Sequence, residues 1–295
     1  MTASTGLVPV GRTIPACGRL MDTPLDDNKL IYTSENTRTC FRLHWSLALF
    51  WRTPVPERTL TTCMEDVKPL AEGDGIRILE HCMAGPNVSL FLLSTGPALS
   101  PADVVRTMKG RLQHAVRKTQ PKAFRRNYFI TSVGTSGRRL IEGYVASQAE
   151  HHRMADDRVQ EALVRCQMVN SDVDLAVEND SAHGRYIHNL HLVFVNAERW
   201  RDVREDQLRK NNETILRVSR AEGHRVSRIG VFSDHVHIAL GCGVNDAPSR
   251  VALCYMNALA HSQGSVPVYQ CGYYAGTFGE YSMEAIRRRL RDMPP

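Results

Sequence analysis

Short apolar runs with alternating polar positions recur along the chain, and polar stretches of helical character separate them. Alternation with a period of two is typical of half-buried β-strands, whereas apolar positions three or four residues apart indicate amphipathic helices. The pattern predicts the order strand, helix, strand pair, helix, strand, helix twice over, and its clearest ranges are 43–51, about 57–71, 76–94 and 100–118, then 186–195, 198–223, 226–241 and 248–262. Strands interleaved with helices in this way predict an α+β fold, in which helices pack on an antiparallel sheet.

The two series also resemble each other in sequence. Three blocks occur in the same order in both, and the pairs are 43–50 with 187–194, 76–93 with 226–240, and 126–134 with 271–279. The last pair shares a Tyr-aromatic step, a small hydroxyl residue and a final glycine, and its members lie 145 residues apart. Three matches in order indicate a duplicated unit.

The repeat divides the chain into four predicted segments. These are an N-terminal extension over 1–38, a first domain over 39–150, a linker over 151–183 and a second domain over 184–295. The extension is rich in Thr, Pro, Gly and Asp, and the linker is polar with an amphipathic helix expected near 157–168. A chain of 295 residues is long enough for two such domains, each with its own core.

Composition narrows the class of protein. Hydrophobic residues make up 42% and charged residues 23% of the chain, which is a globular composition. The formal charge of +6 and the pI near 8.9 fit a nucleic-acid partner, and they fit a mildly basic soluble protein equally well. Eight cysteines without a Cys-x-x-Cys pair, beside no signal peptide, predict a reducing cytoplasm. No apolar run reaches about 18 residues, so we expect no membrane span.

A His-x-His pair lies in the second copy. His235 and His237 are two residues apart in an apolar strand, so they project from the same face and Val236 from the other. Two neutral imidazoles on one face can bind a divalent metal. The alternative is a pair of half-buried histidines that are satisfied by hydrogen bonds.

A Tyr-x-x-x-Gln pair lies in the first copy. Tyr144 and Gln148 are four residues apart in a predicted helix and share a face. A tyrosine hydroxyl can attack a phosphodiester when a metal polarises the phosphate, and the Gln148 amide oxygen could be a third metal ligand. By itself, the same pair is also typical of a surface helix.

The two copies complement each other. The alignment sets Asn87, Val88 and Ser89 opposite the histidine triplet, and the register of 145 sets Arg289 opposite Tyr144 and Met293 opposite Gln148. One copy therefore has the tyrosine without the histidines, and the other has the histidines without the tyrosine. This pattern is expected if one working site combines the two, across a pseudo-dimer inside a single chain.

A basic cluster lies on and just after the helix that is predicted over 100–118. We expect it to contact phosphates in a salt-dependent manner, and its members are Lys109, Arg111, Arg117, Lys118, Lys122, Arg125 and Arg126. Nearby aromatic residues could stack on bases, although a solvated helix face would have the same composition.

Four motifs carry a resemblance to a known family. They are Met108-Lys-Gly-Arg111, Tyr128-Phe129 through Ser132-Val-Gly134, Tyr144 with Gln148, and Asp234-His-Val-His237. Together they resemble the single-tyrosine HUH transposases of the smallest bacterial insertion sequences and the REP-associated tyrosine transposases. The resemblance covers about 40–150 and 184–290, although its motifs are shared between the two copies.

The resemblance implies two tandem ferredoxin-like HUH domains and a single-stranded DNA endonuclease and strand transferase that cuts beside DNA hairpins. Tyr144 would form the 5′-phosphotyrosine link, and His235, His237 and Gln148 would bind Mg²⁺ or Mn²⁺. Family dimers have two sites whereas this chain would have one, so we expect a monomer that acts as a pseudo-dimer.

Two alternatives remain at this point. The first is a domesticated DNA-hairpin binding protein with little or no catalysis. The second is a replication-initiator HUH enzyme, whose helical tyrosine would be Tyr255, although Leu259 stands where a polar partner would be expected.

Overall fold

A computed structural model of the chain describes residues 30–151 and 154–291. The first half contains β2 (His44–Trp51), α1 (Glu57–Gly73), β3 (Ile76–Met83), β4 (Val88–Thr95), α2 (Pro101–Val116), β5 (Phe124–Val133) and α3 (Arg138–His151). The second half repeats this order as β9 (Asn189–Asn196), α5 (Glu205–Glu222), β10 (Arg225–Val231), β11 (His235–Gly241), α6 (Pro248–Ser262), β12 (Tyr269–Thr277) and α7 (Met283–Arg291). The predicted α+β class is confirmed.

The strand order identifies the fold of each half. The first-half sheet runs β3-β4-β2-β5 and the second-half sheet runs β10-β11-β9-β12, with antiparallel neighbours throughout. With the order strand, helix, strand, strand, helix, strand, both halves have the ferredoxin-like arrangement.

One face of each sheet packs on a pair of helices. In β2, Trp45, Leu47 and Leu49 point to α1 and α2 and are fully buried, because alternate side chains share a face. In the second half, β9 and β11 pack in the same way on α5 and α6. A capping box between Ser100 and Asp103, with Pro101 at the first helical position, fixes the start of α2.

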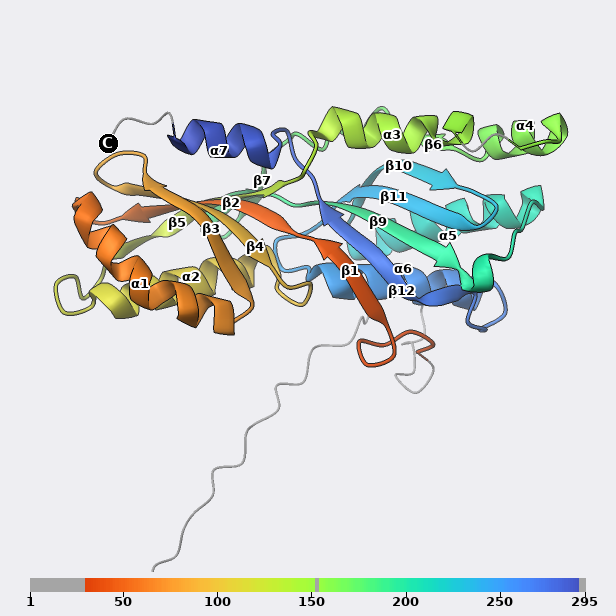
Figure 1. Cartoon of the computed structure of the whole chain (residues 1–295). Helices are drawn as coiled ribbons and strands as arrows, with labels where there is room; N and C mark the ends of the chain where they lie inside the picture. The colour runs from red at the N-terminus through yellow and green to blue at the C-terminus, as the bar shows by residue number, and fades with distance from the viewer. Residues whose placement is uncertain (1–29, 152–153, 292–295) are drawn as a thin grey trace, which may run out of the picture.

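The opposite faces receive helices from the other half. α3, which ends the first half, packs on β10 and β11, and α7, which ends the second half, packs on β3 and β4. Figure 1 shows both helices above the sheets, while α1, α2, α5 and α6 lie below. Each half therefore depends on the other for one of its layers.

Two edge strands are exchanged as well. β1 (Arg38–Arg42) precedes β2 in the chain but pairs in parallel with β12, and β8 (Gly184–Ile187) precedes β9 but pairs in parallel with β5. The segments that were expected to open the two domains thus extend the sheets of the opposite halves. The cause is that β12 and β5 would otherwise be open edges, and a parallel strand covers each of them.

The predicted linker has structure of its own. It contains α4 (Asp157–Arg165), β6 (Met168–Val169) and β7 (Asn179–Ser181), so the helix expected near 157–168 forms and ends slightly earlier. β6 extends the second-half sheet beside β10, and β7 extends the first-half sheet beside β8. Most of the predicted N-terminal extension lies outside the described residues, but Tyr32 is buried and its hydroxyl donates to the Tyr269 carbonyl (3.0 Å).

The chain segments that lead into α3 and α7 cross at two glycines, Gly134 and Gly279. A Cβ on Gly134 would lie 2.8 Å from the Ser136 carbonyl oxygen and 2.9 Å from that of Thr277, and a Cβ on Gly279 would overlap the Ser132 carbonyl. Only glycine permits this approach of two backbones. The shared glycine of the repeat therefore marks the crossing point.

The shared small hydroxyl residue holds the same crossing together. The hydroxyls of Ser132 and Thr277 both bond to backbone groups. Ser132 Oγ donates to the Phe278 carbonyl (2.7 Å) and accepts from the Asn189 amide (3.0 Å). Thr277 Oγ1 donates to the Val133 carbonyl (2.7 Å) and accepts from the His44 amide (2.8 Å). Each bond has its counterpart 145 residues away.

No helix in the described part of the chain is long and apolar enough to cross a membrane.

Candidate active site

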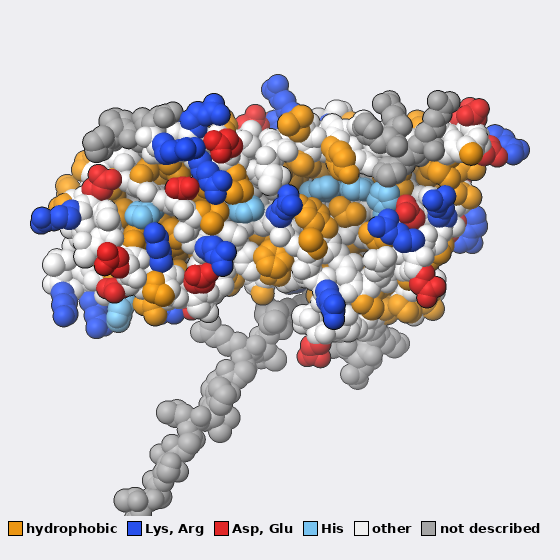
Figure 2. All heavy atoms as spheres, viewed as in Figure 1, with side chains coloured by type: hydrophobic (Ala, Val, Ile, Leu, Met, Phe, Trp, Pro, Cys, Tyr) orange, Lys and Arg blue, Asp and Glu red, His pale blue; other side chains and the backbone are white. Residues whose placement is uncertain are grey.

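The histidine pair projects from the face of the second-half sheet that α3 covers. Val236 and Ile238 of β11 point into the core against α5 and α6, so His235 and His237 point the other way. Their residues are only 8% and 5% exposed. Figure 2 shows a row of histidine side chains that still reaches the surface over the strands of the second half.

α3 brings Tyr144 to these histidines. The Tyr144 ring meets the His237 ring edge-on, with centroids 5.8 Å apart, and 46% of the residue remains exposed. The Cα partner of His237 on β10 is Gly230, where a Cβ would lie 2.9 Å from the Phe232 ring, so the lack of a side chain there makes room for that ring. The tyrosine of the first half and the histidines of the second half are thus side by side.

Gln148 lies one helical turn beyond Tyr144 and is buried. Its residue is 2% exposed, and its Oε1 has no hydrogen-bond donor among the described residues. An unpaired buried amide oxygen costs about 1–3 kcal/mol, so such an atom calls for a partner. A cation is one partner that this oxygen can take.

Both histidines use Nδ1 to contact the protein. His235 Nδ1 lies 2.6 Å from Asp234 Oδ1, and His237 Nδ1 lies 2.9 Å from His191 Nε2. Burial opposes ionisation of Asp234, but the hydrogen bond with His235 and the charge of Arg199 outweigh it, and the pKa of this carboxyl is lowered. Contacts of this kind fix the orientation and tautomer of metal-binding imidazoles, which then bind through Nε2.

His191 is a third histidine at the site, which we did not predict from the sequence. It lies on β9, and its ring stacks on the His237 ring with centroids 5.2 Å apart. The centroid of the Tyr144 ring lies 6.3 Å from that of His191. Burial lowers the pKa of His191 to about 4, so the ring is neutral at pH 7. The alternation of Leu190, Leu192 and Phe194 into the core was a usable signal, because it sends His191 to the opposite face.

Two imidazoles and one amide oxygen are a donor set that suits a divalent cation, and His235, His237 and Gln148 are the residues that would hold it. In the described part of the chain, no three His, Cys, Asp or Glu side chains group in a way that could hold a metal ion. The buried Gln148 oxygen and the two oriented imidazoles are therefore the observations that support a metal here.

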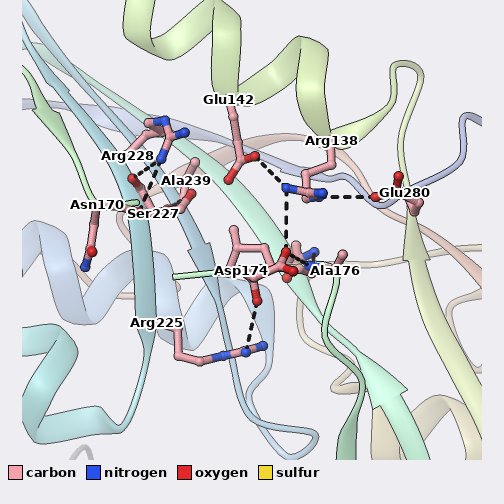
Figure 3. A network of polar contacts seen from close by, with 12 residues as sticks. Arg138, Glu142, Asn170, Asp174, Ala176, Arg225, Ser227, Arg228, Ala239 and Glu280 are labelled. Atoms are coloured by element: carbon pink, nitrogen blue, oxygen red, sulfur yellow. Dashed lines mark hydrogen bonds and ion pairs between the residues drawn. The ribbon is translucent and has the colours of Figure 1, made fainter. Parts of the chain in front are cut away.

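A polar network holds the first turn of α3 (Figure 3). The Arg138 guanidinium contacts Glu142 on its own helix (3.0 Å), Asp174 from the segment after β6 (3.7 Å) and Glu280 before α7 (3.2 Å). Arg138 and Glu142 have side chains that are 17% and 8% exposed, so their contact is shielded from water, whereas Asp174 and Glu280 are exposed. They fix α3 relative to both halves.

The predicted phosphate-binding cluster divides into two groups. Lys109 Nζ donates to three backbone carbonyls of residues 125–127, and burial lowers its pKa to about 8. Arg111 makes two hydrogen bonds with the Asp74 carboxylate (2.7 and 2.8 Å). The other five members are exposed, namely Arg117, Lys118, Lys122, Arg125 and Arg126. Lys109 and Arg111 thus have structural partners, and the exposed five remain the candidates for DNA contacts.

The strand register corrects the residue correspondence between the halves. His191 pairs with Ala239 across the second-half sheet, and Ser46 pairs with Leu92 across the first. His235 and His237 thus correspond to Val88 and Leu90, and the predicted alignment with Asn87–Ser89 was wrong by one residue. Ser89 faces α1 and α2, where its Oγ accepts from Trp51 Nε1 (2.5 Å), so a shift of one residue reverses the face.

α7 meets the first-half sheet through an apolar cluster. Leu92, Val133 and Ile286 are its buried members, and partly buried Leu79, Met283 and Leu290 pack against them. Arg289, which corresponds to Tyr144, is exposed, and Met293 lies outside the described residues. In the described part of this α7 contact, Val88 and Leu90 stand where the histidine pair stands in the second half.

Tyr255 is unsuited to act as a nucleophile. It is fully buried in the core on α6, its hydroxyl lies 3.1 Å from His224 Nδ1, and burial raises the pKa of Tyr255 well above its usual value. The replication-initiator alternative loses its candidate tyrosine for this reason.

No protein-family model matches the chain, and no curated protein matches it. Among solved structures, a protein from Deinococcus radiodurans R1 named a "putative transposase" has 16% identity and a TM-score of 0.29, over 37% of this chain and 92% of that one. A REP-associated tyrosine transposase bound to a REP hairpin has 15% identity and a TM-score of 0.27, over 36% of this chain and 63% of that one. Likenesses at this level do not assign a family or an activity.

Proposed function

We propose that the chain is a metal-dependent enzyme that nicks and rejoins single-stranded DNA beside hairpins, in the manner of a single-tyrosine HUH transposase, with one composite site. The observation that carries this proposal is the contact of Tyr144 on α3 of the first half with His237 on β11 of the second half. Folded as a pseudo-dimer, one chain would supply the nucleophile and the metal ligands from opposite halves.

His235 and His237 would bind the ion through Nε2, and Gln148 would bind it through Oε1. Mg²⁺ or Mn²⁺ in this place would polarise the oxygens of the scissile phosphate. Gln148 and Tyr144 share one face of α3, so the helix that delivers the nucleophile also completes the ligand set.

Tyr144 would attack the phosphorus of one phosphodiester. The bond between Tyr144 Oη and phosphorus forms, and the bond between phosphorus and the 3′ oxygen breaks. The phenol gives its proton to solvent, and the leaving 3′ oxygen takes a proton from solvent to become a hydroxyl. The strand end with the 5′ phosphate remains on the protein. Attack by a 3′-hydroxyl on this link would rejoin the strand and release Tyr144.

His191 and Asp234 would act as positioning residues. Each occupies the Nδ1 of one ligand histidine, at 2.9 Å and 2.6 Å respectively, and thereby turns Nε2 toward the ion. Neutral His191 can donate or accept in this contact, so it can set the tautomer of His237 without adding charge.

A single composite site limits what one molecule can do. One tyrosine can cut and rejoin one strand, and exchange between two DNA ends would need two molecules. The five exposed basic residues would contact phosphates, so binding should weaken as salt rises.

A cleavage assay tests the proposal. The protein is incubated with labelled single-stranded hairpin oligonucleotides, with Mn²⁺ or with EDTA, beside the variants Tyr144→Phe and His235→Ala. Tyr281→Phe is the matched control, because Tyr281 is similarly exposed (56%) and lies just before α7, which packs on the other sheet. We expect a covalent protein–DNA adduct that requires the metal, is lost in both variants and persists in the control.

Other outcomes have defined meanings. Hairpin binding without any adduct would contradict the enzyme and favour a DNA-binding protein that lacks turnover. An adduct that survives in Tyr144→Phe would identify another nucleophile, and Tyr274, whose ring lies 5.9 Å from His191, would be next.

A further inference from the structure

An open cleft lies at the edge of the first half where β5 meets β8. The cleft has a volume of about 340 Å³ and is formed by β5, Phe50 of β2 and the turn between β7 and β8. Phe129 and Arg185 are Cα partners on the parallel strands β5 and β8, and the Arg185 guanidinium lies 5.8 Å from the Phe129 ring centroid. Two flat surfaces, one aromatic and one cationic, thus line the cleft.

The cleft lies on the sheet face opposite α1 and α2. Phe129 pairs with Ala48 of β2, and Phe50 shares the face of Ala48, whereas Leu47 and Leu49 point to the helices. This is the face that corresponds to the histidine site on the second-half sheet.

Two residue differences between the halves bear on the position of the Phe129 ring in this cleft. The residue that corresponds to Phe129 is Tyr274, whose ring folds over Gly276, because a Cβ there would lie 2.9 Å from Tyr274 Cζ. In the first half, Thr131 stands in the place of Gly276 and carries a Cβ. Phe129 therefore cannot lie flat along its own strand and instead faces Arg185.

The chemistry of the cleft matches a nucleobase. Aromatic rings and guanidinium planes stack on bases of any sequence, and polar groups at the rim can meet the base edges. Asn127 and His183 provide both donors and acceptors, while Asp180 provides only an acceptor, as for an exocyclic amino group.

The charge beside the cleft matches a DNA backbone. Arg125 and Arg126 are exposed on β5 immediately before Asn127, and both belong to the predicted phosphate-binding cluster. Arg185 has one carboxylate partner, Glu178 (2.7 Å), and its side chain remains 65% exposed. A strand with one base in the cleft would have its neighbouring phosphates next to these arginines.

We propose that this cleft binds a nucleobase of single-stranded DNA, stacked on Phe129 and Arg185, with the adjacent phosphates at Arg125 and Arg126. The first half would then hold a strand that it does not cut, on the same face as the site that cuts. The inference rests on the proposed function and extends it by a second DNA-binding site.

Affinity for DNA tests the stacking. Binding of a fluorescent oligothymidylate to the full-length protein is measured by anisotropy for the parent, Phe129→Ala and Arg185→Ala. We expect both variants to bind at least about five-fold more weakly, which is the lower end of the effect of losing one stacked base. Phe129→Tyr keeps an aromatic ring, that of the corresponding residue Tyr274, and should bind like the parent. Arg220→Ala, at an exposed position of α5, should also bind like the parent.

Photo-cross-linking gives the position. An oligonucleotide with 5-iododeoxyuridine should cross-link to a peptide that contains Phe129 or Phe50, and the thermal midpoints of the variants should match the parent. Unchanged affinity in both alanine variants, cross-links confined to other peptides, or an equal loss of affinity for blunt duplex DNA would each overturn the proposal.

The adduct assay separates this failure from failure of the proposed function. If the parent forms the metal-dependent adduct while Phe129→Ala and Arg185→Ala bind normally, only the cleft proposal fails. If the parent forms no adduct but the two variants lose affinity for single strands, the cleft proposal stands and the cleavage proposal fails. A parent that neither forms the adduct nor binds single strands would overturn both.

Discussion

The molecule has two seams, the contact of α3 with the second-half sheet and the contact of α7 with the first-half sheet. They have the same architecture but different residues. Where α3 lies on the second-half sheet, the Tyr144 ring contacts the rings of His191 and His237, and the buried amide oxygen of Gln148 has no hydrogen-bond donor among the described residues. Where α7 lies on the first-half sheet, Leu92, Val133 and Ile286 form a closed apolar cluster. The comparison teaches that helices at corresponding positions can be held by different contacts, because α7 packs through an apolar cluster and one ion pair, Arg287 with Glu80 (3.4 Å).

The helix starts show the same contrast. Arg138 begins α3 within a network of three carboxylates, and its counterpart at the start of α7 is Met283, which packs against the apolar cluster. Ion pairs fix direction and distance, whereas apolar contacts tolerate small shifts. As the proposed nucleophile, Tyr144 would need the first kind of support.

The largest effect is expected from moving the nucleophile. Tyr144→Phe should reduce adduct formation by at least about a thousand-fold, since it removes the attacking oxygen. Adding Arg289→Tyr to this variant should not restore the adduct, because Val88 and Leu90 offer no metal ligands below α7. Gel analysis of labelled DNA measures this, and recovery of the adduct in the double variant would mean that the two seams are equivalent.

A smaller effect is expected on the free energy of unfolding, and it should differ between the two seams because their packing differs. Leu92→Ala should destabilise the protein by about 2–4 kcal/mol, because it opens a cavity in the apolar cluster. Gln148→Leu should be neutral or slightly stabilising without metal, since it removes an unpaired buried amide. Urea unfolding in EDTA measures both, and a loss at Gln148 as large as that at Leu92 would contradict the account of the α3 seam.

The smallest effect concerns His191. His191→Ala should weaken Mn²⁺ binding by about 10–100-fold, because it removes the hydrogen bond that orients His237. Ser46→Ala, at the corresponding position of the first-half sheet, should leave Mn²⁺ binding unchanged. Titration calorimetry with Mn²⁺ alone measures this, and equal affinities in the two variants would remove His191 from its positioning role.

The sequence predicts the parts of this molecule that repeat or alternate. The α+β class, the order of elements and the spacing of 145 residues at the crossing follow from local patterns, and the structure confirms the fold class. The same patterns single out Tyr144, Gln148 and the histidine pair, and the structure brings the tyrosine to the histidines. Their roles in catalysis remain predictions.

The rest depends on contacts between distant residues. The exchange of β1 and β8 depends on which open edge is available, and no local pattern records this. The error of one residue at Val88 and Leu90 arose because sequence identity outweighed the face of Ser89, which only the hydrogen bond with Trp51 defines. Lys109 looks like a phosphate ligand in sequence, but its ammonium binds backbone carbonyls of β5.

The crossing at Gly134 and Gly279 has a consequence for heredity. In a homodimer with exchanged helices, every substitution appears in both subunits, so neither site can change without the other. In this chain, each seam is encoded by its own codons. Residues at one seam can therefore change, as Val88 and Leu90 show, while the histidines at the other seam are kept. A symmetric pair of identical subunits does not allow this.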